Sequence, residues 1–450
     1  MRAYSRAARG LLAGVASAGL AALPARADEL QVPETYPSIQ AAIAAAAPGD
    51  KVLVAPGTYA ENVDFLGKAL TVVGLSGPED TVIDGGGTAP AVRFQSANGP
   101  DSTLRGFTVT NGTAGIMIGL SFGATGAAPN VVDCVVRANA GPGIFGWGSE
   151  ARIDDCVIAE NTGPGVEFQW FGDTTLRNCL VQGNQAMFFG SGIYADENAV
   201  VRAHNCTIVG NSGVPGVYTT FDAHAELVNC IVRGNTSPQI GTGIGSLDVR
   251  HSNVEGGFAG AGNLDADPLF VDAVGGDWRL QSASPCVDAG DSGADLLPRD
   301  FFGDPRVGNG AVDLGFDEHH PLQGDTTTLP LGTGAVLTLR LDTGPGRAGE
   351  NYLVLGSLTG TSPGVPLASG VLPLVPDGYF LHTLTHPNGA PLVDSLGVLD
   401  GAGVAQALFV LPPLDLPFLV GTTVHHAYAS FDRAGVPGPV SNAYGARFVD

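Results

Sequence analysis

The chain contains almost no lysine and carries a large excess of negative charge. Among its 450 residues only Lys51 and Lys68 are lysines, and 21 basic residues stand against 44 acidic ones, a net charge of −23. This excess repels polyanions, which argues against nucleic acid and anionic lipid as main partners. It also disfavours polyuronates, unless a bound cation or a local arginine cluster screens the repulsion.

Beyond its first residues the chain has no apolar run long enough to cross a bilayer. Arg2, Arg6 and Arg9 precede an apolar stretch over residues 11–23, and Ala25 and Ala27 offer the small side chains of a signal peptidase site. We therefore expect residues 1–27 to be a cleaved signal peptide. The mature protein is expected to be secreted, extracellular or held at the cell surface, without membrane insertion.

Long helical patterns are nearly absent as well. The chain has 66 glycines and 31 prolines, which indicates many short strands and tight turns, and therefore an all-β protein. Only 14% of the residues are charged and the mean hydropathy is positive, so disorder is not expected over most of the length. The length exceeds what one compact core usually holds.

A repeat of 22 to 27 residues runs through the middle of the chain. Each unit has a cysteine, a β-branched residue two positions later and an asparagine five positions later. Such a unit is too short for its own core, so stacked units must share one. The strand-like apolar runs exclude helical repeats, and we predict a right-handed parallel β-helix. The cysteines are Cys134, Cys156, Cys179, Cys206 and Cys230, and the asparagines are Asn139, Asn161, Asn184, Asn211 and Asn235.

Stacked coils place equivalent residues about 4.8 Å apart, so identical residues form ladders. Cysteine is small and apolar enough for an interior ladder of free thiols. Disulfides between neighbours remain an alternative, since this spacing does not forbid them. A closed tetrahedral zinc cage does not fit a linear stack. The asparagines can adopt left-handed turn conformations and bond the asparagine of the next coil.

A second strand in each coil begins with Ile144, Val166, Ile193 or Val217, which we expect to point inward. Because side chains alternate along a strand, the residues at odd offsets from these should face outward. They combine aromatic rings with carboxylates, as a sugar-binding surface requires. The predicted substrate-binding residues are Phe145, Trp147, Gln169, Tyr194, Tyr218 and Asp222.

Glu167 and Asp196 lie on the same predicted face, one coil and two residues apart. That offset corresponds to about 8 Å, given strand and residue spacings of ~4.8 and ~3.3 Å. The two carboxyl groups of an inverting glycosidase are ~6.5–9.5 Å apart. Glu167 and Asp196 are therefore the candidate catalytic pair. A solvated acidic face without chemistry, or a face that only binds carbohydrate, remains an alternative.

The residues near the start of the mature chain predict a cap for the β-helix. Ile39, Ala42, Ile43 and Ala46 follow helical spacing after Ser38, so a short helix is expected to cover the open end of the core. The following KVLVAPGTYAENV, GKALTVVG and TVIDGGG segments resemble the opening of pectin lyase-like proteins. The resemblance spans roughly residues 33–320 and implies a parallel β-helix. That fold occurs in lyases, hydrolases, esterases, epimerases and binding proteins, so it implies no single chemistry.

Acidic residues gather towards the end of the repeats, in NLDADPLFVD, SPCVDAGD, PRDFFGDPR and GAVDLGFDE. These segments resemble the closing segment, often called a choice-of-anchor region, of secreted bacterial β-helix proteins. They are explained either by turn-forming aspartates and arginine–carboxylate pairs that close the helix, or by a structural Ca²⁺ site. The spacing matches no EF-hand or glycine–aspartate nonapeptide. No other cofactor and no other metal site is expected.

From residue 324 the cysteines disappear, and alternating strands are separated by proline and glycine turns. We predict a β-helix domain over residues 28–323 and a β-sandwich-like domain over residues 324–450. GPGRAGENYLVLGSLTGTSPG resembles a C-terminal module of various secreted bacterial proteins and implies no activity. The pairs at residues 319–320 and 425–426 are histidines. Neighbours on a strand point to opposite faces, so we interpret these histidines as solvated rather than as metal ligands.

Two functions remain. The first is a monomeric, non-catalytic protein that binds a polysaccharide or cell-surface glycan, or that serves in scaffolding or adhesion. The second is a polysaccharide lyase or inverting glycoside hydrolase that acts on the outward face. The sequence lacks the characteristic motifs of polygalacturonases, pectin methylesterases and alginate epimerases. It also lacks the arginine and lysine cluster that pectate lyases use, so we favour the first function.

Overall fold

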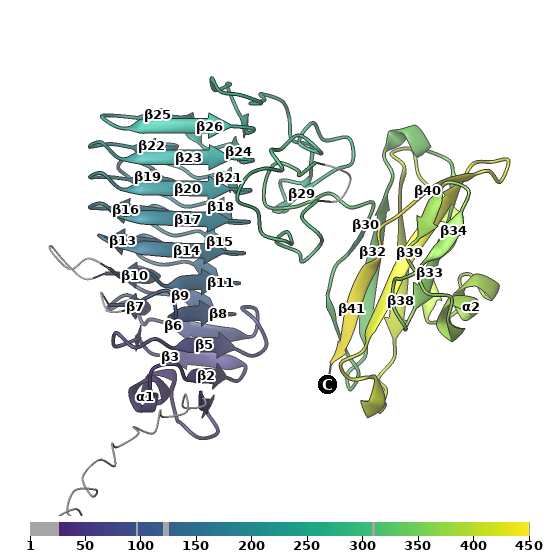
Figure 1. The fold of residues 1–450 in the computed structure, drawn as a ribbon, viewed down its shortest axis with the longest axis horizontal. Helices are drawn as coiled ribbons and strands as arrows, with labels where there is room; N and C mark the ends of the chain where they lie inside the picture. The colour runs from purple at the N-terminus through teal and green to yellow at the C-terminus, as the bar shows by residue number, and fades with distance from the viewer. Residues whose placement is uncertain (1–26, 96–97, 120–125, 308–310, 450) are drawn as a thin grey trace, which may run out of the picture.

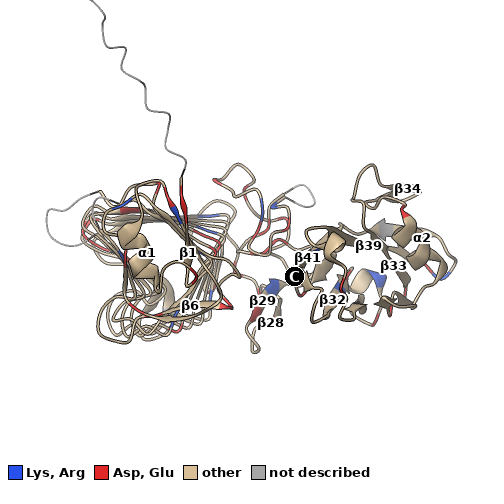
Figure 2. Cartoon of the chain, turned by 90° about the horizontal axis from the view of Figure 1, so that it is seen from below, with Lys and Arg blue, Asp and Glu red and all other residues tan. Residues whose placement is uncertain are grey.

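The computed structural model describes residues 27–95, 98–119, 126–307 and 311–449, so the predicted signal peptide lies outside the described residues except for Ala27. Residues 29–254 form a right-handed parallel β-helix of about nine turns, which confirms the predicted fold class (Figure 1). Each complete coil contributes one strand to each of three parallel sheets, and the incomplete coils at the two ends contribute to one or two of them. Seen along the axis, the coils superimpose and α1 lies across one end (Figure 2).

The first sheet has ten strands: β1 (Glu29–Val32), β2 (Lys51–Val54), β5 (Thr71–Gly74), β8 (Thr103–Arg105), β11 (Asn130–Val132), β14 (Glu150–Asp154), β17 (Asp173–Arg177), β20 (Val200–His204), β23 (His224–Val228) and β26 (Ser246–Arg250). The second has nine: β3 (Gly57–Ala60), β6 (Thr81–Asp84), β9 (Thr108–Thr110), β12 (Val135–Arg137), β15 (Val157–Ala159), β18 (Leu180–Gln182), β21 (Thr207–Val209), β24 (Ile231–Arg233) and β27 (Asn253–Val254). The third has eight: β4 (Val63–Asp64), β7 (Val92–Phe94), β10 (Ile116–Ile118), β13 (Ile144–Trp147), β16 (Val166–Gln169), β19 (Ile193–Ala195), β22 (Pro215–Thr219) and β25 (Thr236–Thr242).

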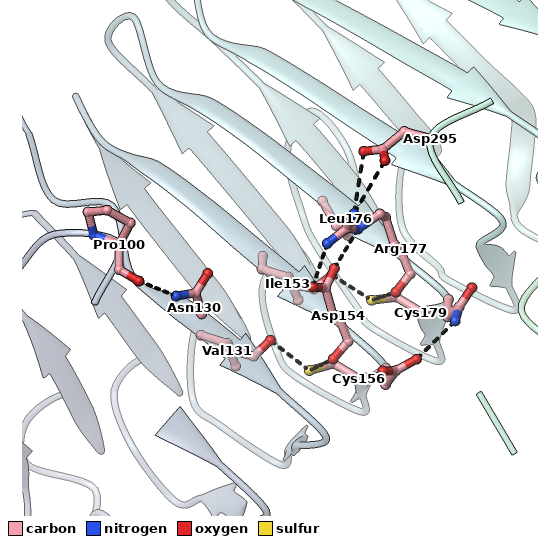
Figure 3. A network of polar contacts seen from close by, with 12 residues as sticks. Pro100, Asn130, Val131, Ile153, Asp154, Cys156, Leu176, Arg177, Cys179 and Asp295 are labelled. Carbon is pink, nitrogen blue, oxygen red and sulfur yellow. Dashed lines mark hydrogen bonds and ion pairs between the residues drawn. The ribbon is translucent and has the colours of Figure 1, made fainter. Parts of the chain in front are cut away.

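The cysteine ladder lies inside the helix, where the chain passes from the first sheet to the second. All six cysteines are buried and free. The Sγ atom of Cys156 lies 3.6 Å from the carbonyl oxygen of Val131 in the preceding coil (Figure 3). The Sγ atom of Cys179 lies 3.3 Å from the carbonyl oxygen of Ile153, also in the preceding coil. Cys286 is separate from the ladder and packs with Leu280 in a small core of its own.

The asparagine ladder forms a continuous chain of buried hydrogen bonds. Asn161 donates through Nδ2 to Oδ1 of Asn184 at 2.9 Å, and Asn184 donates in the same way to Asn211 at 2.9 Å. The bonding to neighbouring asparagines is therefore as predicted. The prediction that these asparagines adopt the left-handed conformation is wrong. The residue before each asparagine adopts it instead, for example Glu160 or Gly183, and this turn points the asparagine side chain inward.

The predicted N-terminal cap is confirmed. α1 (Ile39–Ala45) begins at Ser38, whose hydroxyl accepts a bond from the third amide of the helix, and it buries its apolar side on the first coil. The carboxylate of Glu61 accepts bonds from the backbone amides of Ile39 and Gln40, both at 2.9 Å. A residue of the first coil thus holds the positive end of the helix.

The closing segment (residues 265–321) does not close the end of the β-helix, so that prediction is wrong. It lies beside the later coils, against the second sheet, and includes the hairpin β28 (Phe270–Asp272) and β29 (Asp277–Leu280) (Figure 1). Asn178, Asn205 and Asn229 donate to its backbone carbonyls at 2.7–3.1 Å. Arg177 pairs with Asp154 of its own helix and with Asp295 of the closing segment (Figure 3).

The C-terminal residues form two further sheets around a shared core, as expected for a small β domain. One contains β30 (Leu322–Gly324), β32 (Ala335–Asp342), β38 (Val404–Leu411) and β36 (Leu392–Val393). The other contains β31 (Thr328–Pro330), β41 (Tyr444–Val449), β39 (Thr423–Phe431), β33 (Asn351–Ser357), β37 (Leu396–Val398) and β40 (Pro437–Val440). A hairpin of β34 (Val365–Leu367) and β35 (Gly370–Leu372), the helix α2 (Gly378–Thr385), and the 3₁₀ turns at Pro345–Arg347 and Pro417–Leu419 complete it. Among the described residues, no helix is long and apolar enough to cross a membrane.

The histidine pairs were wrongly interpreted as solvated. His319, His320 and His426 are buried, and only His425 is partly exposed. His426 sits on β39, where its ring packs against Phe409 and its Nε2 lies 3.1 Å from the Tyr379 hydroxyl. Burial lowers the pKa of His426 to about 3, so this ring is neutral.

Candidate functional site

The outward side of the third sheet has the predicted alternation and register. Phe145 pairs with Glu167, Glu167 with Tyr194, and Tyr194 with Tyr218, in four consecutive coils. The intervening side chains point inward and are buried. The inward ring of Phe168 leaves no room for a side chain in the neighbouring coil, where a Cβ on Gly146 would lie 2.1 Å from it. We call the outward residues Phe145, Trp147, Glu167, Gln169, Asp196 and Tyr218 the outer face.

Glu167 and Asp196 are diagonal neighbours on this face. Asp196 follows the last residue of β19 and lies two positions beyond Tyr194, the cross-strand partner of Glu167, which is the predicted offset. Oε1 of Glu167 accepts a 2.6 Å bond from Gln169, and Oδ1 of Asp196 accepts a 2.8 Å bond from the Glu197 amide. Both carboxylates are therefore held in place by local bonds.

The surroundings of Glu167 shift the pKa of its carboxyl group. Burial raises the pKa of Glu167 to about 7, with a further contribution from the negative charge of Asp196, against the opposing effect of the Gln169 hydrogen bond. Near neutral pH a substantial fraction of Glu167 is therefore protonated. A protonated carboxyl beside a second carboxyl group is the pairing that acid–base chemistry on glycosidic bonds requires.

Aromatic rings lie at the end of these strands. Trp147 stacks on Trp170 with ring centres 6.0 Å apart and planes 11° apart, and Phe171 meets Trp170 edge-on. Trp170 and Phe171 are both in the left-handed backbone region, with φ of 56° and 58°. Bulky residues rarely adopt this conformation, which costs about 1–3 kcal/mol each. The turn thereby presents Phe171 to solvent with 65% of its surface exposed.

A second aromatic group lies at the beginning of the strands. Met187, Phe188 and Phe189 precede β19 and are exposed, and Phe189 stacks on Tyr194 with centres 5.0 Å apart and planes 5° apart. Tyr194 is consequently only 2% exposed. The structure therefore corrects its predicted role as an accessible binding residue, because it supports Phe189 instead. Burial, followed by the neighbouring Asp196, raises the pKa of its hydroxyl.

The remaining predicted residues divide into two groups. Phe145, Trp147, Gln169 and Tyr218 are partly exposed on the outer face, as expected. Asp222 is not on the face, because β22 ends at Thr219 and the chain turns away. Asp222 lies in that turn with φ of 62°, beside the sheet rather than on it, which corrects the prediction.

Sequence reasoning did not identify Trp170 or the exposed group at residues 187–189. One signal was present: the interval from Cys179 to Cys206, at 27 residues, is the longest in the ladder. The extra residues form the segment that carries Met187, Phe188 and Phe189. An apolar insertion in a surface turn has no role in the core and indicates an exposed function.

A second charged surface lies on the first sheet and is internally paired. Arg202 pairs with Asp173 and lies 3.5 Å from Glu226, and Arg250 contacts Glu226 at 2.6 Å and Asp248 at 2.7 Å. Each guanidinium thus has carboxylate partners within the stack. These contacts join neighbouring coils and leave little unpaired positive charge to attract an anionic ligand.

Residues 91–257 match the protein-family model described as the right handed beta helix region. No curated protein matches the chain. Among solved structures, a pectin methylesterase mutant in complex with a hexasaccharide aligns at 11% identity and a TM-score of 0.26, over 52% of this chain and 90% of that chain. A full-length tailspike protein 2 from Escherichia coli O157:H7 bacteriophage CAB120 aligns at 10% identity and a TM-score of 0.25, over 94% of this chain and 68% of that chain.

Proposed function

We propose that this protein is exported and binds a polysaccharide outside the cell or at its surface, with the glycan lying across the coils on the outer face. The observation that carries the proposal is the arrangement of aromatic groups around two carboxyl groups. Trp147, Trp170 and Phe171 lie at one end of the strands, Phe189 at the other, and Glu167 and Asp196 between them. Flat apolar rings beside hydrogen-bonding groups are suited to sugars.

The charge of the chain favours a neutral glycan. The net charge is −23, and the outer face itself carries the carboxyl groups of Glu167 and Asp196. A polyuronate would be repelled at such a surface. We therefore expect binding to neutral polysaccharides to exceed binding to pectin-like acidic ones at the same concentration.

Glycan-array binding of the chain from Asp28 onward tests this proposal. Trp170→Ala and Phe171→Ala should each weaken binding about 2- to 10-fold, because a stacked aromatic contact contributes about 0.5–1.5 kcal/mol. Phe418→Ala is the matched control, since Phe418 is an equally exposed phenylalanine in the C-terminal domain. Equal affinity of all three variants and the parent would contradict the location of the site.

The raised pKa of Glu167 favours a second candidate function, hydrolysis of the bound glycan, whereas lyase cleavage would require that the glycan be a polyuronate. Glu167 would donate a proton to the departing glycosidic oxygen, while the carboxylate of Asp196 takes a proton from the water whose oxygen forms the new bond to the anomeric carbon. Assays for new reducing ends and for unsaturated products distinguish the two functions. Turnover that is lost in Glu167→Gln while binding persists supports the enzyme, and binding without turnover in the parent supports a binding protein.

A further inference from the structure

Three potential metal ligands converge where the closing segment meets the C-terminal domain. Ligand atoms of Asp300, Asp304 and His320 all lie within 4.8 Å of one another. Asp300 and Asp304 belong to a tight turn, in which each backbone amide bonds the other residue's oxygen at 2.8–2.9 Å. His320 stands two residues before β30. The group therefore joins two parts of the chain that are 16 residues or more apart.

The His320 ring is buried and presents an unused nitrogen. The residue is 4% exposed, and its Nε2 has no hydrogen-bond partner. The backbone carbonyl of Pro305 also interacts with the ring. A buried imidazole nitrogen without a hydrogen-bond partner is a group that a bound metal ion can satisfy.

The carboxylate of Asp300 is held in place by two backbone amides. Oδ1 of Asp300 accepts from the Asp304 amide and Oδ2 accepts from the Glu318 amide, at 2.8 and 3.0 Å. A cation bound by the two carboxylates and the His320 ring would provide the missing partner for Nε2 of His320.

We propose that Asp300, Asp304 and His320 bind a divalent transition-metal cation of the Zn²⁺ class, with water completing its coordination. The imidazole decides the class, because Ca²⁺ and Mg²⁺ prefer ligands that are all oxygen, whereas Zn²⁺ accepts nitrogen together with carboxylate oxygen. The ion would fasten the turn at residues 300–304 to the end of the closing segment, two residues before β30. It would therefore be structural, and it is independent of the outer face.

This proposal differs in its cation from the structural Ca²⁺ site that the acidic residues of the closing segment suggest. Metal–ligand distances of about 2.0–2.2 Å place tetrahedral ligand atoms about 3.4 Å apart, and the three ligand atoms here all lie within 4.8 Å of one another. Asp304 is only partly buried, so its side chain can adjust to that spacing. Binding should therefore tighten the turn without moving the coils.

The test uses the chain from Asp28 onward after treatment with a chelator, titrated with Zn²⁺ in competition with a chromophoric chelator. His382→Gln and His386→Gln are introduced first, because these two rings stack 4.9 Å apart on the surface of α2 and could bind the ion themselves. In that background we expect one equivalent of Zn²⁺ and an increase in melting temperature. His320→Gln and Asp304→Asn should each lower the affinity by about 10- to 100-fold or more.

His319→Gln is the matched control. It replaces an equally buried neighbouring histidine whose Nδ1 lies 3.2 Å from the Leu280 carbonyl oxygen and which is not part of the group. Zn²⁺ affinity should be retained in this variant, and Co²⁺ substitution should give a visible spectrum that His320→Gln abolishes. If His320→Gln fails to fold, Asp304→Asn decides the question. Unchanged affinity in Asp304→Asn, or preference for Ca²⁺ over Zn²⁺, would overturn the proposal.

Discussion

A single buried amide, that of Asn184, joins three coils of the helix. Its Oδ1 accepts from the backbone and Nδ2 of Asn161, at 3.1 and 2.9 Å, and its Nδ2 donates to Asn211 and to the Ile158 carbonyl oxygen, each at 2.9 Å. Asn184→Ala would leave several buried groups without partners, each costing about 1–3 kcal/mol. We expect the free energy of unfolding in urea to fall by about 3 kcal/mol or more.

Asn130→Ala provides the comparison for this ladder. Asn130 is only partly buried, and its amide donates to the carbonyl oxygen of Pro100 near the surface (Figure 3). Water can replace that bond, so the loss should be below about 1 kcal/mol. Equal losses for Asn130→Ala and Asn184→Ala would show that the buried ladder is not a special source of stability.

The raised pKa of Glu167 leads us to expect that the stability of the folded protein decreases as the pH rises. Its pKa in the folded protein is raised to about 7, above the unfolded value of about 4.3, so the folded state holds the proton more tightly. The contribution of Glu167 to the free energy of unfolding is fully present below pH ~4 and is lost as the pH rises through about 7. Glu167→Gln should remove this loss and make the protein more stable than the parent at pH 8, by on the order of 1–3 kcal/mol.

Urea unfolding at pH 5 and at pH 8 measures this effect. Asp222→Asn is the control, since it removes one negative charge from an exposed turn near the same sheet. The stability difference between Glu167→Gln and the parent should grow from pH 5 to pH 8 by more than the difference for Asp222→Asn. A pH-independent difference would contradict the assigned burial of Glu167.

Among the elements, the short helix α1 depends on a residue from the coil that it covers. It has seven residues, too few to be stable alone, and both Glu61 carboxylate oxygens accept bonds from its first amides. Glu61→Ala should destabilise the cap by about 1–2 kcal/mol. Amide hydrogen exchange should accelerate in α1 and in β1, which it protects, with little change in β17. Glu34→Ala, at an exposed position, should leave exchange unchanged.

Strand positions were predictable because they depend on local repetition. The cysteine, the apolar residues and the asparagine recur at fixed offsets, and stacking turns each offset into a ladder. The burial of Tyr194 and His320 was not predictable in this way. Tyr194 is covered by Phe189 from the longest interval of the ladder, and His320 by the fold of the closing segment. Both depend on contacts between irregular segments, which no periodic pattern encodes.

At the scale of the whole molecule, the closing segment packs against coils whose sequence provides hydrogen-bond donors for it. The residue before each cysteine is aspartate in the early coils, Asp133 and Asp155, but asparagine in the later ones. An asparagine can donate a bond that an aspartate cannot, and Asn178, Asn205 and Asn229 all donate to the closing segment. The change from aspartate to asparagine therefore marks where the segment docks on the helix.

Truncation tests whether this docking protects the helix. Leu180, Val209 and Ile231 point outward from the second sheet and are buried by the closing segment. Their exposure would cost about 1.5–3 kcal/mol each and create an apolar patch. A chain of residues 28–321 should remain folded and monomeric, because the C-terminal domain has its own core. A chain of residues 28–268 should bind a hydrophobic dye and aggregate.

A further variant separates the apolar patch from a general loss of folding. In residues 28–268, threonine at positions 180, 209 and 231 keeps β-propensity while it removes apolar surface. This variant should recover a monomeric elution volume and the far-ultraviolet circular dichroism of a β protein. If it aggregates as readily as the unmodified truncated chain, the closing segment is required for the coils to fold, and not only to cover Leu180, Val209 and Ile231.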